Sequence, residues 1–232
     1  MIQDSEQIRR NVEEIRKRIA QAAAKAGRKP EEITLVAVTK TVEPTRIIAA
    51  IDAGVCDLGE NRVQELCEKH GLVDRQCNWH FIGHLQTNKV KYIIDKVKMI
   101  HSVDSEELAK EIERRAEKAG RQIDILVQIN IAKEESKFGI YKEEAEDFIR
   151  KLSKYDHLKV KGLMTIAPFT DNKDEIRHVF RELRKVFIDI RRKNIDNIDM
   201  ESLSMGMSND FEIAVEEGAT IVRIGTSIFG KR

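Results

Sequence analysis

The spacing of apolar residues predicts a helix at the start of the chain. Its apolar positions recur every three or four residues, at Ile8, Val12, Ile15 and Ile19, and Arg, Lys and Glu fill most of the positions between them. This period places the apolar side chains on one face of a helix. Gly27 is a suitable residue to end that helix.

A different pattern begins after Pro30. The run Ile33–Thr39 is apolar almost throughout, short, and rich in β-branched residues. These features are typical of a strand that is buried on both faces of a sheet.

Strand-like and helix-like segments then alternate along the chain. Further strands are predicted at Asp57–Gly59, Trp79–Ile82, Met99–Ser102, Ile123–Ile129, Val160–Thr165, Ser202–Ser204 and Thr220–Ile224. Amphipathic helical segments are predicted at Pro44–Ala53, Val63–Lys69, Asn88–Lys96, Ser105–Ala119, Lys142–Ser153, Asp174–Lys193 and Asn209–Glu217. Asp104 and Glu107 have the spacing of a capping box at the start of the fourth of these helices.

Alternation of strands and helices indicates parallel strands joined by right-handed crossovers. Eight strands fit a closed (β/α)8 barrel, also called a TIM barrel, and an open doubly wound sheet is the alternative. No Pro-, Gly- or Ser-rich linker interrupts the sequence, so we predict one domain over residues 1–232. The extra N-terminal helix is expected to cover part of the barrel wall.

Composition and charge narrow the class of protein. Lys and Arg total 41 and Asp and Glu total 40, so the net charge is +1, which argues against a nucleic-acid or membrane-surface partner. The first residues lack the pattern of a signal peptide, and no apolar stretch is long enough to span a bilayer. The three cysteines form no CxxC motif, and the histidines show no metal-ligand spacing. We therefore expect a cytoplasmic protein without a metal site.

Polar residues follow directly after the predicted strands, where a barrel of this kind carries its chemistry. Lys40 ends the first strand, so its amine is expected at the inner mouth of the barrel. Burial disfavours the charged form of an amine and makes it a nucleophile toward carbonyl groups. Alternatively, Lys40 extends outward to solvent, as many lysines at strand ends do.

Small residues follow the last two strands. The seventh strand leads into Ser204–Ser208, and the eighth leads into Gly225-Thr226-Ser227. Glycines allow close approach of the backbone to a ligand, and amides and hydroxyls can hold a phosphate, which this architecture commonly binds after strands 7 and 8. Two ordinary small-residue turns are the alternative.

Arg223 and Asn61 are two further candidates. Arg223 lies within the last strand, and if its side chain points inward it needs an acceptor, either a ring nitrogen of a ligand or a structural carboxylate. Asn61 lies in Gly59-Glu60-Asn61-Arg62 and either hydrogen-bonds a ligand or caps the helix that begins at Val63.

Several motifs stand in the order found in a known family. They are Val38–Lys40, Gly59–Glu65, His80–Lys89, Gln128–Asn130, Lys137–Gly139, Gly162–Met164, Leu203–Ser208 and Val222–Gly230. Over essentially its whole length, the chain resembles the pyridoxal-phosphate homeostasis protein family. The resemblance implies a single barrel like the N-terminal domain of alanine racemase, with pyridoxal 5′-phosphate (PLP) as its cofactor.

The resemblance also implies roles for individual residues. Lys40 matches the lysine that forms the PLP aldimine, Arg223 matches the arginine that faces the pyridine nitrogen, and Asn61 lies beside the cofactor. Ser204, Gly225 and Thr226 match positions that hold its phosphate. Met205 and Met207 belong to the same loop.

Other positions are less fixed by the resemblance. Lys137 resembles a second lysine linked to cofactor transfer. Val42 stands where many members carry a lysine, which argues against a relay of cofactor between adjacent lysines, and His84 stands where some members carry proline.

These residues favour a PLP carrier over an enzyme. An arginine facing the ring nitrogen makes the ring a poorer electron sink, and the sequence offers no second acid–base residue. We expect a non-catalytic protein of intracellular vitamin B6 homeostasis, monomeric or weakly dimeric, with PLP-requiring apoenzymes as recipients. The alternative is a single-domain PLP-dependent enzyme such as an amino-acid racemase.

Overall fold

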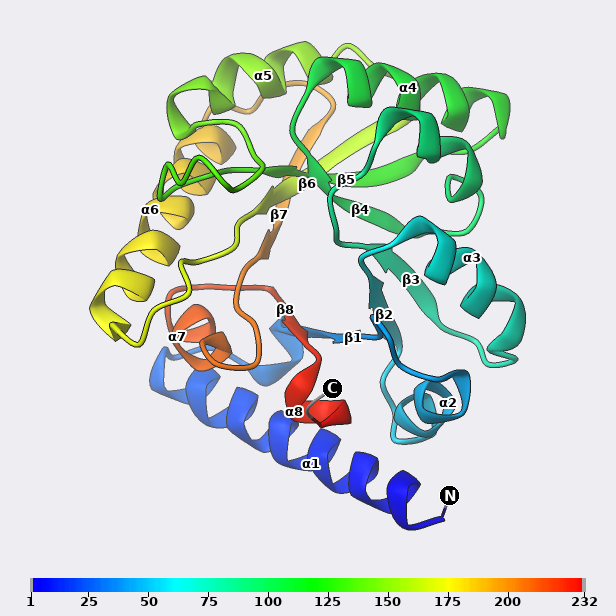
Figure 1. The fold of residues 1–232 in the computed structure, drawn as a ribbon. Helices are drawn as coiled ribbons and strands as arrows, with labels where there is room; N and C mark the ends of the chain where they lie inside the picture. Colours follow the sequence, from blue (N-terminus) through cyan, green and yellow to red (C-terminus); the bar gives the residue numbers. More distant parts are fainter. Residues whose placement is uncertain (1, 231–232) are drawn as a thin grey trace.

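Eight parallel strands close into a barrel in the computed structural model, which describes residues 2–230 (Figure 1). The strands are β1 (Thr34–Val38), β2 (Asp57–Glu60), β3 (Asn78–Phe81), β4 (Met99–Val103), β5 (Ile123–Gln128), β6 (Leu158–Met164), β7 (Ile198–Ser204) and β8 (Ile221–Ile224). Each strand pairs with the next along the chain, and β8 pairs with β1. The predicted (β/α)8 barrel is confirmed, and the open doubly wound sheet is excluded.

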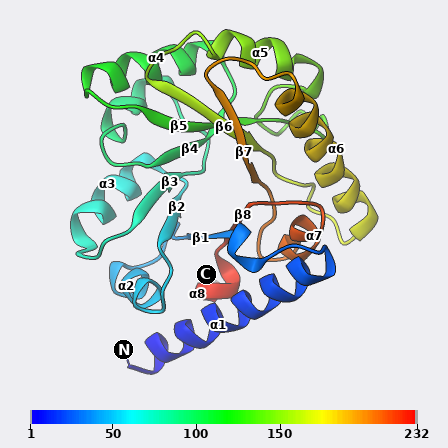
Figure 2. The same ribbon diagram turned by 180° about the vertical axis from the view of Figure 1, so that it is seen from behind.

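Helices surround the barrel on its outside, as the view from behind also shows (Figure 2). They are α1 (Ile2–Lys25), α2 (Pro44–Asp52), α3 (Val63–Leu72), α4 (Glu106–Lys118), α5 (Ala145–Leu152), α6 (Lys173–Arg192), α7 (Phe211–Glu216) and α8 (Thr226–Phe229), with 3-10 helices η1 (Pro30–Glu32), η2 (Thr87–Tyr92) and η3 (Lys142–Glu144). Within residues 2–230, none of the helices combines the length and the apolar character that a membrane crossing requires.

Two local predictions differ from the structure. The α-helix predicted at Asn88–Lys96 is instead the 3-10 helix η2 followed by turns. Val90, Ile93 and other apolar residues of this segment are still buried, so the apolar spacing alone did not distinguish the two conformations. Helix α4 is capped by Ser105, whose hydroxyl accepts a hydrogen bond from the Leu108 amide at 3.3 Å, and not by Asp104.

Helix α1 covers the barrel where an eighth long helix would otherwise lie. It packs against α2, α7 and α8, and its predicted apolar face is buried. Asn11 donates a hydrogen bond to the carbonyl of Ile228 in α8, and Arg18 forms an ion pair with Glu212 in α7. This packing confirms the expectation that the leading helix covers part of the barrel wall. Helix α8, which follows β8, is only four residues long and leaves that part of the wall to α1.

Two apolar layers stabilise the barrel. The larger layer lies between strands and helices, and a smaller one fills the interior with Val36, Met99, Leu126, Met164 and Ile221. Side chains alternate between these layers along each strand. Polar side chains on the inward positions, such as those of His101 and Arg223, are therefore enclosed by the barrel.

Candidate functional site

The predicted site residues meet at the carboxyl ends of four neighbouring strands. Lys40 follows β1, Asn61 follows β2, Ser204 ends β7, Arg223 lies in β8, and Gly225 and Thr226 begin α8. In the closed ring the order β7, β8, β1, β2 is continuous. The barrel thus brings together residues that are up to 186 positions apart in the sequence, Lys40 and Thr226.

Lys40 lies in the turn beyond β1, and its side chain is half-buried. Among residues 2–230 it has neither a hydrogen-bonding nor an ion-pairing partner. The backbone on both sides of it is fixed. The carbonyl of Thr39 accepts a hydrogen bond from Lys69 Nζ at 2.7 Å, and the amide of Thr41 donates to Glu65 Oε2 at 2.7 Å. Thr41 adopts a φ of 57°, a conformation that non-glycine residues rarely adopt without such support.

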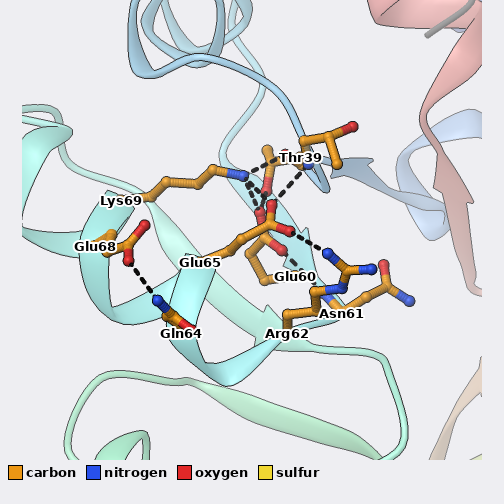
Figure 3. A network of polar contacts seen from close by, with 9 residues as sticks. Thr39, Glu60, Asn61, Arg62, Gln64, Glu65, Glu68 and Lys69 are labelled. Carbon is orange, nitrogen blue, oxygen red and sulfur yellow. Dashed lines mark hydrogen bonds and ion pairs between the residues drawn. The ribbon is translucent and has the colours of Figure 1, made fainter.

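A buried ionic cluster provides this support (Figure 3). Lys69 Nζ lies 2.6 Å from Glu60 Oε1 and 2.8 Å from Glu65 Oε2, and the Thr39 hydroxyl donates to Glu60 Oε1 at 2.8 Å. Glu60 is fully buried and Lys69 nearly so. Burial alone would raise the pKa of Glu65, but hydrogen bonds from Lys69 and the Thr41 amide outweigh it and lower that pKa. The cluster holds the end of β1 against α3.

Asn61 extends from the same cluster toward the barrel mouth. Its backbone N–H donates to Glu60 Oε2 at 3.1 Å, and its side chain points away from the cluster in Figure 3. The helix α3 begins at Val63 with no side-chain cap, so Asn61 does not cap it. Gly83 lies so close that a Cβ there would be 2.3 Å from the carbonyl oxygen of Asn61. The backbone of Asn61 is therefore closely confined, while its side chain is half-buried.

Arg223 points into the barrel and is 3% exposed. Its Nη1 donates to Ser204 Oγ at 2.6 Å, and its Nη2 donates to the Thr165 carbonyl at 2.9 Å. Burial lowers the pKa of Arg223 to about 10, and the charge of Asp210 partly opposes that shift. The guanidinium is therefore a cation at neutral pH. It forms no ion pair with any carboxylate of residues 2–230, so the structural carboxylate considered from the sequence is not its partner.

Ser204 lies deeper than the other predicted phosphate residues. It is fully buried, and its hydroxyl contacts both Arg223 and Nδ1 of His101, the latter at 3.0 Å. Gly225, Thr226 and Ser227 instead lie at the mouth, where the amide of Ser227 donates to Ser208 Oγ at 3.4 Å. Ser208 was not predicted as a site residue, although it belongs to the Leu203–Ser208 motif that the sequence pointed to.

The remaining candidates lie elsewhere around the mouth. Lys137 follows β5, across the ring from β1, and its Nζ donates to Glu134 Oε1 at 2.6 Å and to the Ala167 carbonyl at 2.9 Å. His84 stacks on Phe138 with ring centroids 3.7 Å apart. Met205 is fully buried and Met207 is exposed. Within the described part of the chain, no three His, Cys, Asp or Glu side chains are grouped to hold a metal.

Sequence comparison places this architecture among known proteins. The family model described as "Alanine racemase, N-terminal domain" matches residues 3–232. The "Pyridoxal phosphate homeostasis protein" of Aquifex aeolicus is 45% identical over 216 residues, which cover 93% of this chain and 94% of that protein. The chain belongs to the pyridoxal phosphate homeostasis protein family. The resemblance inferred from the motifs is confirmed.

Solved structures agree with this membership in the homeostasis protein family. PipY of Synechococcus elongatus, solved with PLP bound, has a TM-score of 0.81 and 33% identity, covering 91% of this chain and all of that one. The alanine racemase of Corynebacterium glutamicum shares the fold, with a TM-score of 0.69 at 16% identity, and the chain covers 61% of its length. The barrel of the homeostasis family is thus also part of the larger racemases.

Proposed function

We propose that this protein binds PLP reversibly through a Schiff base on Lys40 and takes part in vitamin B6 homeostasis without catalytic turnover. The observation that carries the proposal is the position of Lys40, a half-buried amine without a protein partner at the strand end next to the strand that carries Arg223. Relatives named for PLP homeostasis and the PLP-bound structure of PipY support the same ligand.

The chemistry follows from an amine and an aldehyde. The nitrogen of Lys40 attacks the carbonyl carbon, a carbon–nitrogen bond forms, and the carbonyl oxygen leaves as water. Hydrolysis reverses the step, which suits a protein that both holds and releases its ligand. The hydrogen bonds at Thr39 and Thr41 fix the backbone that carries Lys40, so less backbone freedom is lost on binding.

Other residues would hold the rest of PLP. Arg223 directs its N–H groups to the ring nitrogen, Asn61 lies beside the ring, and the phosphate is held at Gly225 and Thr226. Ser208 and Ser227 lie in the same part of the mouth and offer further donors. The donor set is cationic or neutral, which matches a phosphorylated ligand with an unprotonated pyridine nitrogen.

Arg223 favours a carrier over an enzyme. A cation against the ring nitrogen opposes its protonation, and the ring then stabilises a carbanion poorly. The alternative, an amino-acid racemase, needs a second acid–base group opposite the lysine, and the sequence offers no candidate for that group. We propose PLP-requiring apoenzymes as the recipients of the released ligand.

The test begins with the parent protein and PLP. A Schiff base gives a yellow absorption band, becomes permanent on reduction with borohydride, and adds the mass of reduced PLP to one peptide. We expect that peptide to contain Lys40, and we expect Lys40→Ala to lose both the band and the added mass. Lys133→Ala is the matched control, because Lys133 is an exposed lysine of the loop after β5. Labelling of Lys40→Ala to the parent level would refute the attachment site.

Turnover is tested separately. The PLP-loaded protein is incubated with single-enantiomer alanine and other amino acids, and the products are resolved by chiral chromatography. No enantiomer or new product is expected beyond the level of free PLP. Racemisation that depends on Lys40 would favour the enzyme over the carrier.

A further inference from the structure

A line of hydrogen-bonded side chains crosses the interior of the barrel. Arg223 Nη1 contacts Ser204 Oγ at 2.6 Å, Ser204 Oγ contacts His101 Nδ1 at 3.0 Å, and His101 Nε2 contacts His80 Nδ1 at 2.9 Å. His80 Nε2 then lies 2.9 Å from Asp57 Oδ1. These five residues come from β8, β7, β4, β3 and β2, and we call them the barrel relay.

The two ends of the barrel relay differ. Arg223 is enclosed near the carboxyl ends of the strands, whereas Asp57 is the first residue of β2. Asp57 and His80 line a cavity of about 470 Å³ at this opposite end, and Lys98 Nζ lies 3.7 Å from Asp57. The barrel relay therefore joins a cation near Lys40 to a carboxylate at the far end of the barrel.

The carboxylate of Asp57 is the acceptor at the far end of the barrel relay. Burial alone would raise the pKa of Asp57, but hydrogen bonds from His80 and Asn78 outweigh it and lower that pKa, so Asp57 accepts from His80 Nε2. Burial and the charges of its neighbours lower the pKa of His101 well below 6.5, so its ring carries one hydrogen. Both ring nitrogens of His101 have a partner, since Nε2 lies 2.9 Å from His80 Nδ1 and Nδ1 lies 3.0 Å from Ser204 Oγ.

The hydroxyl of Ser204 is enclosed between two members of the barrel relay. Its oxygen accepts from Arg223 Nη1 at 2.6 Å, and it lies 3.0 Å from His101 Nδ1. The family resemblance places Ser204 among the phosphate ligands, but its side chain is fully buried and is already engaged by Arg223 and His101. The hydroxyl instead serves as the acceptor that anchors one arm of the guanidinium, and the Thr165 carbonyl anchors the other arm.

We propose that Ser204, His101, His80 and Asp57 are positioning residues that hold the Arg223 guanidinium in place to face the cofactor's ring nitrogen, and that Ser204 does not bind the phosphate. This inference rests on the proposed PLP site and adds the means by which its cation is oriented. Without the Ser204 hydroxyl, Nη1 of Arg223 loses its buried acceptor, and the guanidinium turns toward other acceptors.

The test compares PLP with pyridoxal, which carries the same aldehyde and ring but no phosphate. Ser204→Ala is expected to weaken the binding of both ligands by the same factor, about five- to tenfold, and to shift the absorption band of both. Ser202→Ala is the control, since it removes a hydroxyl from the same strand two residues earlier, outside the barrel relay. Its affinities are expected to equal those of the parent.

Two results with Ser204→Ala would overturn the inference. Weaker binding of PLP with unchanged binding of pyridoxal would mean that Ser204 holds the phosphate. Unchanged binding and spectra for both ligands would mean that Arg223 does not depend on Ser204. A parent protein that forms no absorption band with either ligand would instead refute the proposed function, so the two failures are distinguishable.

The far end of the barrel relay gives an independent test if Ser204→Ala fails to fold. Asp57→Ala removes the terminal acceptor, whereas Asp57→Asn retains an oxygen that accepts from His80. Asp57→Ala is expected to weaken the binding of both PLP and pyridoxal about two- to threefold and to shift their absorption bands. Asp57→Asn is expected to have the affinities and absorption bands of the parent protein. Equal affinities and spectra for the parent and Asp57→Ala, with both proteins folded by circular dichroism, would overturn the inference.

Discussion

Nζ of Lys69 lies 2.7 Å from the carbonyl oxygen of Thr39, the residue that immediately precedes Lys40. The same nitrogen contacts Glu60 and Glu65, whose other bonds reach the amides of Asn61 and Thr41. One buried ammonium group on α3 therefore orders the backbone of both β1 and β2 where they enter the site. The ionic cluster is thus a structural support for the backbone next to Lys40 and Asn61, two of the proposed ligand-binding residues.

Lys69→Met should destabilise the protein and weaken PLP binding together. Removing the ammonium leaves Glu60 buried without its charge partner, which costs about 3–5 kcal/mol of unfolding free energy. Urea denaturation followed by circular dichroism measures this loss, and absorbance titration measures affinity. Glu68→Ala, an exposed change on the same helix, should alter the unfolding free energy by less than about 0.5 kcal/mol. Equal effects from both substitutions would contradict the supporting role of Lys69.

Gly83→Ala and Gly71→Ala should change stability in opposite directions. A Cβ at Gly83 would lie 2.3 Å from the Asn61 carbonyl oxygen, so the backbone there must shift, at a cost of about 1–3 kcal/mol, and PLP affinity should fall with it. A Cβ at Gly71, in helix α3, meets nothing within 4 Å and should add about 0.5–1 kcal/mol through helix propensity. Thermal melts of the two variants provide the comparison.

Stability should fall in acid between about pH 4.5 and pH 2. Hydrogen bonds from Lys185 and Lys142 lower the pKa of Glu182 to about 2, and Arg114 and Arg115 lower that of Glu111 to about 2. A carboxyl group whose pKa is lower in the folded state stabilises the fold above its unfolded pKa, and that contribution is lost as pH falls. Glu182→Gln should therefore be less stable than the parent at pH 7 and should lose less stability on acidification. Parallel curves of melting temperature against pH would contradict this assignment.

Arg223→Glu should change the protonation of the bound ligand. A carboxylate against the pyridine nitrogen favours its protonated form, whereas the guanidinium opposes it. With ¹⁵N-labelled PLP, the ring nitrogen signal should move toward that of a pyridinium in the variant. A parent-like chemical shift together with parent-like affinity would mean that Arg223 does not face the ring.

The sequence predicted the fold well because the barrel repeats one simple pattern. The apolar run Ile33–Thr39 and its seven counterparts correspond to the eight strands, and the face of Ile8, Val12 and Ile15 is buried as expected. Segment η2 was predicted incorrectly because buried apolar residues three and four apart suit either an α-helix or successive tighter turns.

The site was predictable only in part. Residues at strand ends, such as Lys40, could be identified by their position after apolar runs. The bond between His101 and Ser204 spans 103 positions and crosses the barrel interior, so no local pattern indicates it. The same is true of the contact between Lys69 and Thr39, which depends on the packing of α3 against β2. Inward-facing polar residues in strands, such as His80, were the available signal for the barrel relay.

The contact between α1 and α8 has a consequence for biosynthesis. Asn11 donates to the Ile228 carbonyl, and Arg46 joins Asp4 to the Phe229 carbonyl, so α1 docks on a segment that is synthesised 217 positions after Asn11. Pairing of β1 with β8 likewise waits until β8 has been synthesised. Until β8 has been synthesised the barrel cannot close, and chaperones have that interval in which to act on the unpaired edge of β1.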